Sequence, residues 1–507
     1  MSFSFSDESS PPPDVVTRYQ NALSARAPWQ TLWQDCYDLT LPELARFTRP
    51  TPFIGTSTRA HLYDGTAPDA VDQLAASLLG QLTPPWVNWV GLAPGSDMSG
   101  MLADRLVPIL AASTRTIQDH IDRSNLHMEL HQCFLDLVVG GTACIMITEN
   151  PVGAATAFSA RAVPLSDMVL AEDDRGDLTH VYIPRIVPRA TLLAYTETNT
   201  PRDLHARLQA SDQQEWNIVD YAYPLADGQY VTGRWVDMDD DAPVVLSSRT
   251  LSYSPYIVFR WMKVPGDAYG RSPVMKALPD IRTANKVVEL ILKNASIAAT
   301  GIWQADDDGV INPANIDLVP GAIIPKAVGS AGLKPLEMPA RFDVSQLVLD
   351  DLRTRIRHAL LADRFPALDP GLRLTATEVR ARDDEASLIL GAIYGRLQSE
   401  LLTPLVTRLY TLLKDRGEIA DLPLDGRVVQ LMHRSPLARV QSERSLRGLM
   451  GFIDVVAALG AEARQGLNVP AFTRHIADTL GVPDDLLAPQ SLASELIPST
   501  TEGKNHD

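Results

Sequence analysis

The sequence predicts an α+β protein that is mostly helical and has two β-rich regions. Apolar residues recur at helical spacing through most of the first 140 residues. Between residues 142 and 262 the spacing changes to two, in short runs rich in Val, Ile and Tyr. A third stretch, 272–417, reads as a helix, a segment of short strands and turns, a second helix, a Pro/Gly loop and a long third helix.

The composition is that of a large globular protein without a disulfide framework. The chain has 507 residues, 45% of them hydrophobic, which is ample for a large core. Its formal net charge of -17 argues against a protein that wraps nucleic acid with its whole surface, because such binding requires clustered Lys and Arg. Cys36, Cys133 and Cys144 form no CxxC pair and have no companion histidine cluster, so neither disulfides nor a zinc module is expected.

Neither end of the chain reads as a targeting signal. Residues 1–13 are acidic and proline-rich, which is typical of a disordered tail, and they lack the apolar run of a secretory signal. Residues 488–507 are expected to form a mobile acidic tail. The most apolar window, 133–148, contains Asp136 and is too short to cross a bilayer as a helix, so no membrane span is predicted.

The first 150 residues are expected to be mainly helical. Two helices are expected within Asp14–Leu41, because Pro28 interrupts the helical pattern. An amphipathic helix is expected at Ala67–Leu82 and an aromatic strand at Trp86–Leu92. The other expected elements are helices at 101–122 and 125–138, a break at Gly140-Gly141 and a strand at 142–149.

The period-two region predicts a series of short strands. One or two short helices are expected near 188–210, and the acidic run 237–241 reads as the tip of a hairpin. No fixed-period repeat is present in the sequence, so a solenoid or propeller is not expected. The strands are expected at 161–170, 179–186, 216–223, 229–237, 243–249 and 255–262.

The three helices of the third stretch have recognisable ends. Ser272 and Pro273 begin the first, because serine offers an acceptor to the first amides and proline has a preset φ; Pro279 is expected to kink or restart it. Thr375 begins the third helix, which Pro404 is expected to bend. The second helix carries an apolar stripe of Val344, Val348, Leu352, Ile356 and Leu360.

Arginines cluster at the end of the second helix and in the loop after it. Arg353 and Arg357 share a face of the helix and could pair with Asp350 or Asp351. Between residues 364 and 382, four arginines face two acidic residues, which gives a local charge of +2 in an acidic chain. Contact with nucleic-acid phosphates and ordinary intersubunit ion pairs both fit this cluster.

No motif of the common enzyme classes is present. The sequence has no GxxxxGK[ST], GxGxxG or GxSxG. His127 and His131 have the spacing of metal ligands, but glutamate does not directly follow the first histidine as in zincins. Asp306 and Asp308 resemble part of a calcium loop that lacks its terminal carboxylate. We therefore predict no catalytic residue, no metal site and no cofactor.

Several strings, taken in their joint order, resemble the portal proteins, or head-to-tail connectors, of short-tailed phages. The likeness covers most of the chain, from about residue 14 to 460, and no single string is specific for it. The N-terminal Trp29–Leu41 and Leu62-Tyr-Asp64 contribute to it. The other strings are Ala268-Tyr-Gly-Arg-Ser-Pro273, Leu374-Thr-Ala-Thr-Glu-Val-Arg380, Leu390-Gly-Ala-Ile-Tyr394 and Leu397–Val406.

The resemblance implies a portal fold, with a β-rich wing and clip, that assembles as a homo-oligomeric ring of about twelve subunits around a central channel. The implied parts are a disordered tail (1–13), a wing (14–271), stem helix 1 (272–300), a clip (301–342), stem helix 2 (343–364), a tunnel loop (365–374), a long wing helix (375–417), a crown (418–487) and the acidic tail (488–507).

The resemblance also implies a function without catalysis. The ring would be the conduit for packaging and ejection of double-stranded DNA at one capsid vertex of the virion, after assembly in the host cytoplasm. It would contact the terminase large subunit, the tail adaptor, and the major capsid and scaffolding proteins. The alternatives are a scaffold or minor capsid protein and a metal-dependent nucleic-acid-processing enzyme.

The resemblance assigns roles to three groups of residues. The DNA-facing tunnel loop would present Arg364, Phe365, Pro366, Leu368, Asp369 and Arg373. Subunit contacts in the stem would use Asp350, Asp351, Arg353 and Arg357. The clip would dock partners through Asp306, Asp307, Asp308, Lys326 and Lys334.

Overall fold

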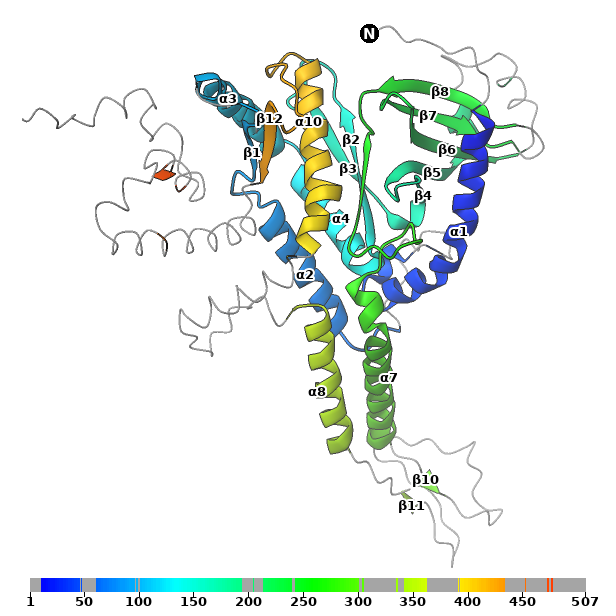
Figure 1. The fold of residues 1–507 in the computed structure, drawn as a ribbon. Coiled ribbons are helices and arrows are strands. Elements are labelled where there is room, and N and C mark those ends of the chain that lie inside the picture. The colour runs from blue at the N-terminus through cyan, green and yellow to red at the C-terminus, as the bar shows by residue number, and fades with distance from the viewer. Residues whose placement is uncertain are drawn as a thin grey trace, which may run out of the picture.

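A body of helices and sheets carries a stem of two helices that projects from it (Figure 1). The body comprises the described residues up to 272 and from 391 to 433, and the stem comprises helices α7 (Pro273–Thr300) and α8 (Phe342–Ala359). The computed structural model describes residues 11–45, 47, 61–95, 97–98, 101–193, 204, 213–238, 242–300, 303–304, 334–335, 342–362, 391, 393–433, 452, 472–473 and 476.

The prediction of two separate helices within residues 14–41 is wrong. One helix, α1 (Pro13–Asp38), contains Pro28 in its interior, and Figure 1 shows that α1 bends along its length. Proline removes one backbone hydrogen bond and bends a helix without necessarily ending it. The side chains of Trp33, Cys36 and Tyr37, which follow the proline, are buried in the main core, so their packing holds the second half of the helix in place.

The other helices of the first 150 residues agree with the prediction. They are α2 (Thr66–Leu82), α3 (Met101–Arg123) and α4 (Leu126–Gly140). Gly141 ends α4 with a φ of 81°, a left-handed conformation that glycine adopts without a steric cost. A Cβ at this position would lie 2.3 Å from the carbonyl oxygen of Gly270, so the glycine also allows that segment to approach.

Three antiparallel sheets form the β part of the body. A three-stranded sheet has the order β3-β2-β9, and a five-stranded sheet runs β4-β5-β6-β7-β8. The expected strand at 161–170 is divided in two by a 3-10 turn at Leu165–Asp167, whereas the hairpin expected around 237–241 connects β7 to β8. The strands are β2 (Thr142–Glu149), β3 (Phe158–Val163), β4 (Val169–Glu172), β5 (Leu178–Pro188), β6 (Glu215–Pro224), β7 (Tyr230–Val236), β8 (Val244–Leu251) and β9 (Tyr256–Arg260).

A third, two-stranded sheet brings the distant end of the chain back to the body. Strand β12 (Val429–His433) pairs with β1 (Val90–Pro94), with His433 opposite Val90. The aromatic strand expected from Trp86 therefore begins later, and the side chain of Trp86 is exposed. The described residues between 418 and 433 thus belong to the body.

The long third helix is irregular just before Pro404. Residues Gln398–Leu402 are π-helical, and the N–H of Thr403 donates to the carbonyl of Gln398, five residues back. The helix continues as α10 (Thr403–Asp415). Pro404 has no N–H to donate, so the change of hydrogen-bond register directly before it keeps the helix continuous.

The main hydrophobic core joins the body to the first turns of the stem. It includes residues of α1, α2, α4, β2, β9, α7, α8 and α10. A smaller core lies between the first half of α1 and the five-stranded sheet, where Tyr19, Tyr182 and Trp235 pack with ring centroids 5.2–6.0 Å apart. Among the helices that the structure describes, none is long and apolar enough to span a membrane.

Candidate functional site: the stem and its junction with the body

Helix α7 (Pro273–Thr300) begins with the cap that the sequence predicts. The hydroxyl of Ser272 accepts a hydrogen bond of 2.9 Å from the backbone N–H of Met275. Pro279 lies inside the helix, which does not restart there. Capping of this kind is worth about 1 kcal/mol, and it fixes the point at which the chain leaves the body.

Helix α8 (Phe342–Ala359) packs beside α7 through an apolar seam. Leu352, Ile356 and Leu360 are buried in that seam as predicted, but Val348 is 47% exposed and Leu349 is buried instead. A stripe repeated every four residues drifts by about 40° per step on an α-helix, so the seam follows alternating spacings of three and four. The residues that α7 contributes are Ala277, Ile281 and Ala284, with Val288 and Ile291 partly buried.

The junction between stem and body is built around Asp64. Arg353 of α8 donates from Nε to Oδ2 of Asp64 at 2.9 Å, and the backbone N–H of Thr66 donates to Oδ1 at 2.9 Å. Asn285 of α7 accepts the backbone N–H groups of Tyr63 and Asp64 at 2.7 and 3.1 Å. Both stem helices are thereby fastened to the segment that precedes α2.

The carboxylate of Asp64 is ionised in this setting. Burial would by itself raise its pKa, but the hydrogen bonds from Thr66 and Arg353 and the charge of Arg353 outweigh burial and hold the pKa below its ordinary value. The carboxylate is shielded from solvent, because the Asp64 side chain is only 4% exposed, whereas the Arg353 side chain is 33% exposed. This ion pair is therefore less sensitive to salt than a surface pair.

The charged residues of α8 form different ion pairs from those that the sequence suggests. Arg353 pairs with Asp64 rather than with Asp350 or Asp351. Arg355 instead contacts Asp280 of α7 at 2.8 Å and Asp351 at 3.9 Å. Asp350 is exposed. The intrachain ion pairs thus tie α8 to α7 and to α2, and leave Asp350 at the surface.

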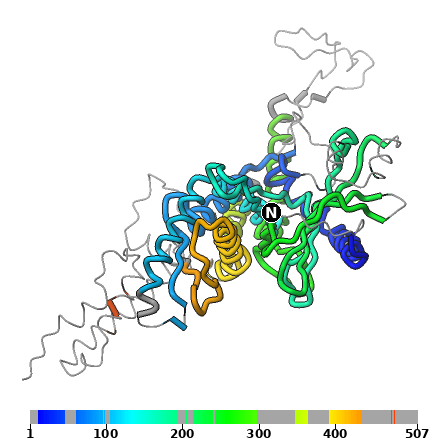
Figure 2. The backbone as a smooth tube through the Cα atoms, turned by 90° about the horizontal axis from the view of Figure 1, so that it is seen from above, coloured from blue at the N-terminus to red at the C-terminus, as the bar shows by residue number. Residues whose placement is uncertain are grey.

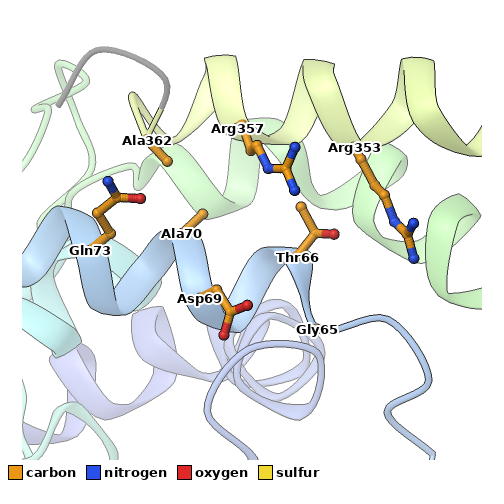
Figure 3. Close-up of a pocket in the computed structure, with 8 residues that line it drawn as sticks. All are labelled: Gly65, Thr66, Asp69, Ala70, Gln73, Arg353, Arg357 and Ala362. Carbon is orange, nitrogen blue, oxygen red and sulfur yellow. The ribbon is translucent and has the colours of Figure 1, made fainter. Parts of the chain in front are cut away.

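Arg357 borders a pocket of about 270 Å³ between α2 and α8 (Figure 3). Its guanidinium points toward the first turn of α2, where Gly65, Thr66 and Asp69 lie. The side chain is exposed, and within the described part of the chain it has no ion pair. Ala362, the last described residue after α8, also borders the pocket.

The stem also exposes large apolar side chains. Leu347 is 74% exposed, and Val348, Leu290 and Leu292 are about half exposed. Leu347 lies two residues before Leu349, about 200° round the helix, so it faces away from α7. By the same reasoning Leu290 faces away from α8, since it lies two residues after Val288. Figure 1 shows no described element of the body beside this lower part of the stem.

Most of the residues predicted for the tunnel loop and the clip lie outside the described residues. These are Arg364, Phe365, Pro366, Leu368, Asp369 and Arg373 for the loop, and Asp306, Asp307, Asp308 and Lys326 for the clip. Lys334 lies in β11 (Lys334–Pro335), which pairs with β10 (Trp303–Gln304). The two strands pair antiparallel where the chain enters and leaves residues 305–333.

Sequence reasoning missed Asp64, Asp280 and Asn285 as the partners of the stem. Asp64 precedes Gly65 and Thr66 at the start of a helix, a pattern typical of an Asx turn, and this signal could have identified it as a capping residue. No local signal connects Asn285 or Asp280 to partners more than 70 positions away. Those contacts follow from the packing of α7 against α2 and α8.

His127 and His131, which have the spacing of metal ligands, lie on α4. Both ring nitrogens of His127 are buried, and burial lowers the pKa of the imidazole despite the opposing influence of Asp122 and of the Thr83 backbone. In the part of the chain that the structure covers, no three His, Cys, Asp or Glu residues come together as metal ligands would.

Comparison with known proteins places the stem and body in a family. Residues 13–487 match the family of bacteriophage head to tail connecting proteins. The chain belongs to this family. It is a portal protein, a structural component of the virion at the head–tail junction, and it has no catalytic role.

Relatives from several phages are similar along most of their length. The probable portal protein of Bordetella phage BPP-1 is 25% identical over 94% of this chain and 88% of the relative. The portal protein of Enterobacteria phage T3 is 23% identical over 92% and 86%, and that of Escherichia phage T7 is 23% identical over 80% and 76%.

Among solved structures, a chain from the virion of a native gene transfer agent particle is similar with a TM-score of 0.32 and 12% identity. The likeness covers 76% of this portal chain and 86% of that chain. It is too distant to support any statement about the fold.

Proposed function

We propose that this portal protein assembles as a closed ring of about twelve subunits around a channel for double-stranded DNA, at one vertex of the capsid. The stem would form the channel wall, the clip (301–342) a collar, and the segment 365–374 a loop that faces the DNA. The crown would comprise residues 418–487, of which Val429–His433 pair with β1 of the body.

The proposal of a ring rests on one observation: large apolar side chains are exposed on opposite sides of the stem. Leu347 and Leu290 are exposed at corresponding heights, since Arg355 of α8 contacts Asp280 of α7 and the two helices run in opposite directions. Two different surfaces on opposite sides of one subunit favour a heterologous, head-to-tail contact. Repeated around an axis, such a contact closes into a ring and buries both leucines.

A substitution that introduces a carboxylate at the centre of that contact tests whether rings form through it. We expect Leu347→Asp to leave the subunit folded, because the side chain makes no buried contact in one chain, and to abolish rings in native mass spectrometry and negative-stain images. Burying an unpaired charge would cost several kcal/mol at every interface. Gln346→Asp is the matched control, because it adds the same charge one residue away on another face of α8 and should leave rings intact.

The wild-type chain provides the decisive outcome. A monomer at all concentrations, or an open filament without an axial hole, would contradict the closed ring. A scaffold or minor capsid protein would likewise lack an axial hole.

The acidic character of the chain supports passage of DNA without tight binding. Its net charge of -17 repels phosphates, and the arginines near the 365–374 loop are a local exception. We propose that Arg364 and Arg373 face the channel, whereas Asp350, Asp351 and Arg357 serve contacts between subunits. Reversing the charge of both loop arginines should reduce packaging or genome retention; unchanged values would remove any electrostatic role of the loop.

The clip is proposed to dock the terminase large subunit and the tail adaptor, with Asp306, Asp307, Asp308, Lys326 and Lys334 at its surface. The short β10–β11 pair closes its base, which supports an independent unit beyond the stem. Deletion of residues 305–333 should therefore abolish docking of these partners while rings still form. Undiminished docking would rule out the clip as the docking site. Contacts with major capsid and scaffolding proteins would lie elsewhere on the ring.

A further inference from the structure

The described part of the chain contains three buried arginines, and they differ in how their charge is satisfied. Arg260 is 2% exposed and bonds Glu172 and Glu400. Arg26 is 5% exposed, donates to the carbonyls of Leu165 and Ser166, and lies over the ring of Trp33 at 5.7 Å. A buried guanidinium requires such partners, because removing it from water is costly.

Arg408 of α10 is the exception. It is 8% exposed, and its Nε, like that of Arg26, is buried without an acceptor. Unlike Arg26, its guanidinium receives neither a hydrogen bond nor an ion pair from the described residues. Burial lowers the pKa of Arg408, and the charge of Arg249 lowers it further. Glu149 and Asp415 act in the opposite direction, but among the described residues neither forms an ion pair with Arg408.

A second positive charge, that of Arg249, favours binding of an anion at Arg408. Arg249 lies on β8 at the edge of the five-stranded sheet, is exposed, and has no carboxylate partner among the described residues. The charge of Arg249, which is exposed, acts on the buried Arg408. Like charges in this arrangement repel unless an anion lies with them.

We propose that Arg408 and Arg249 together receive a carboxylate from a second copy of this chain. The inference rests on the proposed ring. Figures 1 and 2 show α10 on a broad side of the body, between the end that carries α1 and the five-stranded sheet and the end that carries α3. A ring subunit whose wing points outward meets its neighbours on such sides, so the neighbour completes the site.

The recessed position of Arg408 favours a side chain over a DNA phosphate. Duplex phosphates lie on a convex rod and are contacted by protruding Lys and Arg side chains, whereas Arg408 is only 8% exposed. A second copy also supplies carboxylates in excess, with 62 acidic residues against 45 basic ones. An Asp or Glu side chain is narrow enough to enter the recess and bind bidentately.

Arg408→Met tests the site in the full-length protein. Methionine keeps much of the apolar volume and removes a charge that has no partner within one chain, so we expect the isolated subunit to melt at the same or a higher temperature. Rings should become weaker, and the concentration at which half of the chain is assembled, followed by native mass spectrometry on dilution, should rise more than about tenfold. Arg249→Ala should act in the same direction with a smaller effect.

A second arginine variant controls for the loss of a positive charge. Arg175→Met removes an exposed charge from the turn between β4 and β5 and should leave assembly unchanged. If Arg408→Met rings dissociate at the same protein concentration as wild-type rings, the carboxylate site is wrong but the proposed ring is unaffected. If the wild-type chain forms no ring, the proposed function itself is wrong. Stabilisation of the wild-type subunit but not of Arg408→Met by inorganic phosphate, with assembly unchanged, would identify a free anion as the occupant and overturn the proposal.

Discussion

The body and the stem differ in how far one chain buries its charged and apolar side chains. In the body, Arg260 is enclosed by Glu172, Glu400 and backbone carbonyls within one chain. In the stem, only the seam between α7 and α8 is buried, and leucines on the outer faces are exposed. Apart from Arg408, the buried charges of the body are thus satisfied within one chain, whereas the outer faces of the stem leave large apolar side chains uncovered.

The effect of a substitution should therefore depend on the region in which it lies. Away from Arg408, a substitution in the body changes the stability of one subunit, because its partners are within the chain. A substitution on the outer faces of the stem should spare the subunit and change assembly.

Removal of the Arg260 guanidinium should give the largest loss of subunit stability. Arg260 connects the β4–β5 turn, through Glu172 and the carbonyl of Gly176, to Glu400 in the π-helical segment. Arg260→Met leaves Glu172 with Lys263 and Glu400 with Arg396 as their remaining cations, and we expect a loss of about 3 kcal/mol in the free energy of unfolding. Chemical denaturation of the subunit measures this loss, and a loss below about 1 kcal/mol would show that water replaces the arginine.

The stem seam should follow with a smaller effect. Ile356 is 1% exposed between α8 and α7, so Ile356→Ala should cost about 2–4 kcal/mol. Leu347→Ala, on the outer face of the same helix, should cost almost nothing in the subunit and weaken rings instead. Equal losses of subunit stability in the two variants would contradict the division into an inner and an outer face.

A buried carboxyl group makes the stability of the body depend on pH. Asp136 is buried and accepts hydrogen bonds from the hydroxyl of Tyr37 at 2.6 Å and the N–H of Leu165 at 3.2 Å, and burial raises its pKa to about 6. The folded state therefore binds a proton more tightly than the unfolded state, so stability falls as pH rises through about 4 to 6, by about 2–3 kcal/mol.

The variant Asp136→Asn isolates this contribution. It cannot ionise, so its unfolding free energy should lose that slope between pH 4 and 6, whatever its absolute stability. An unchanged slope would show that other groups cause the dependence.

The same division explains how much could be predicted from the sequence. The seam residues Leu352, Ile356 and Leu360, the Ser272 cap and the strand at 142–149 follow from local spacing and capping, and the structure confirms them. Continuity through Pro28 depends on tertiary burial of the residues after it, which local pattern does not report.

The junction shows the same limit for charges. Helical spacing suggests partners for Arg353 three or two positions away, but Asp64, 289 positions away, is buried beside it and binds it. A local ion pair at the surface contributes little, so the distant partner prevails once the helices pack.

An exposed ion pair between the two regions should have the smallest effect. Arg282 of α7 binds Asp35 of α1, and the two side chains are 52% and 41% exposed. Solvent and salt screen this pair, so Arg282→Gln should lower subunit stability by less than about 1 kcal/mol, and the difference from wild type should disappear as salt is raised. Arg353→Gln removes the shielded pair with Asp64 at the same junction and should cost more at every salt concentration, because Asp64 would remain buried without its cation. Unfolding of both variants in a salt series makes this comparison, and equal, salt-dependent losses would mean that the junction at Asp64 is as open to solvent as the stem surface.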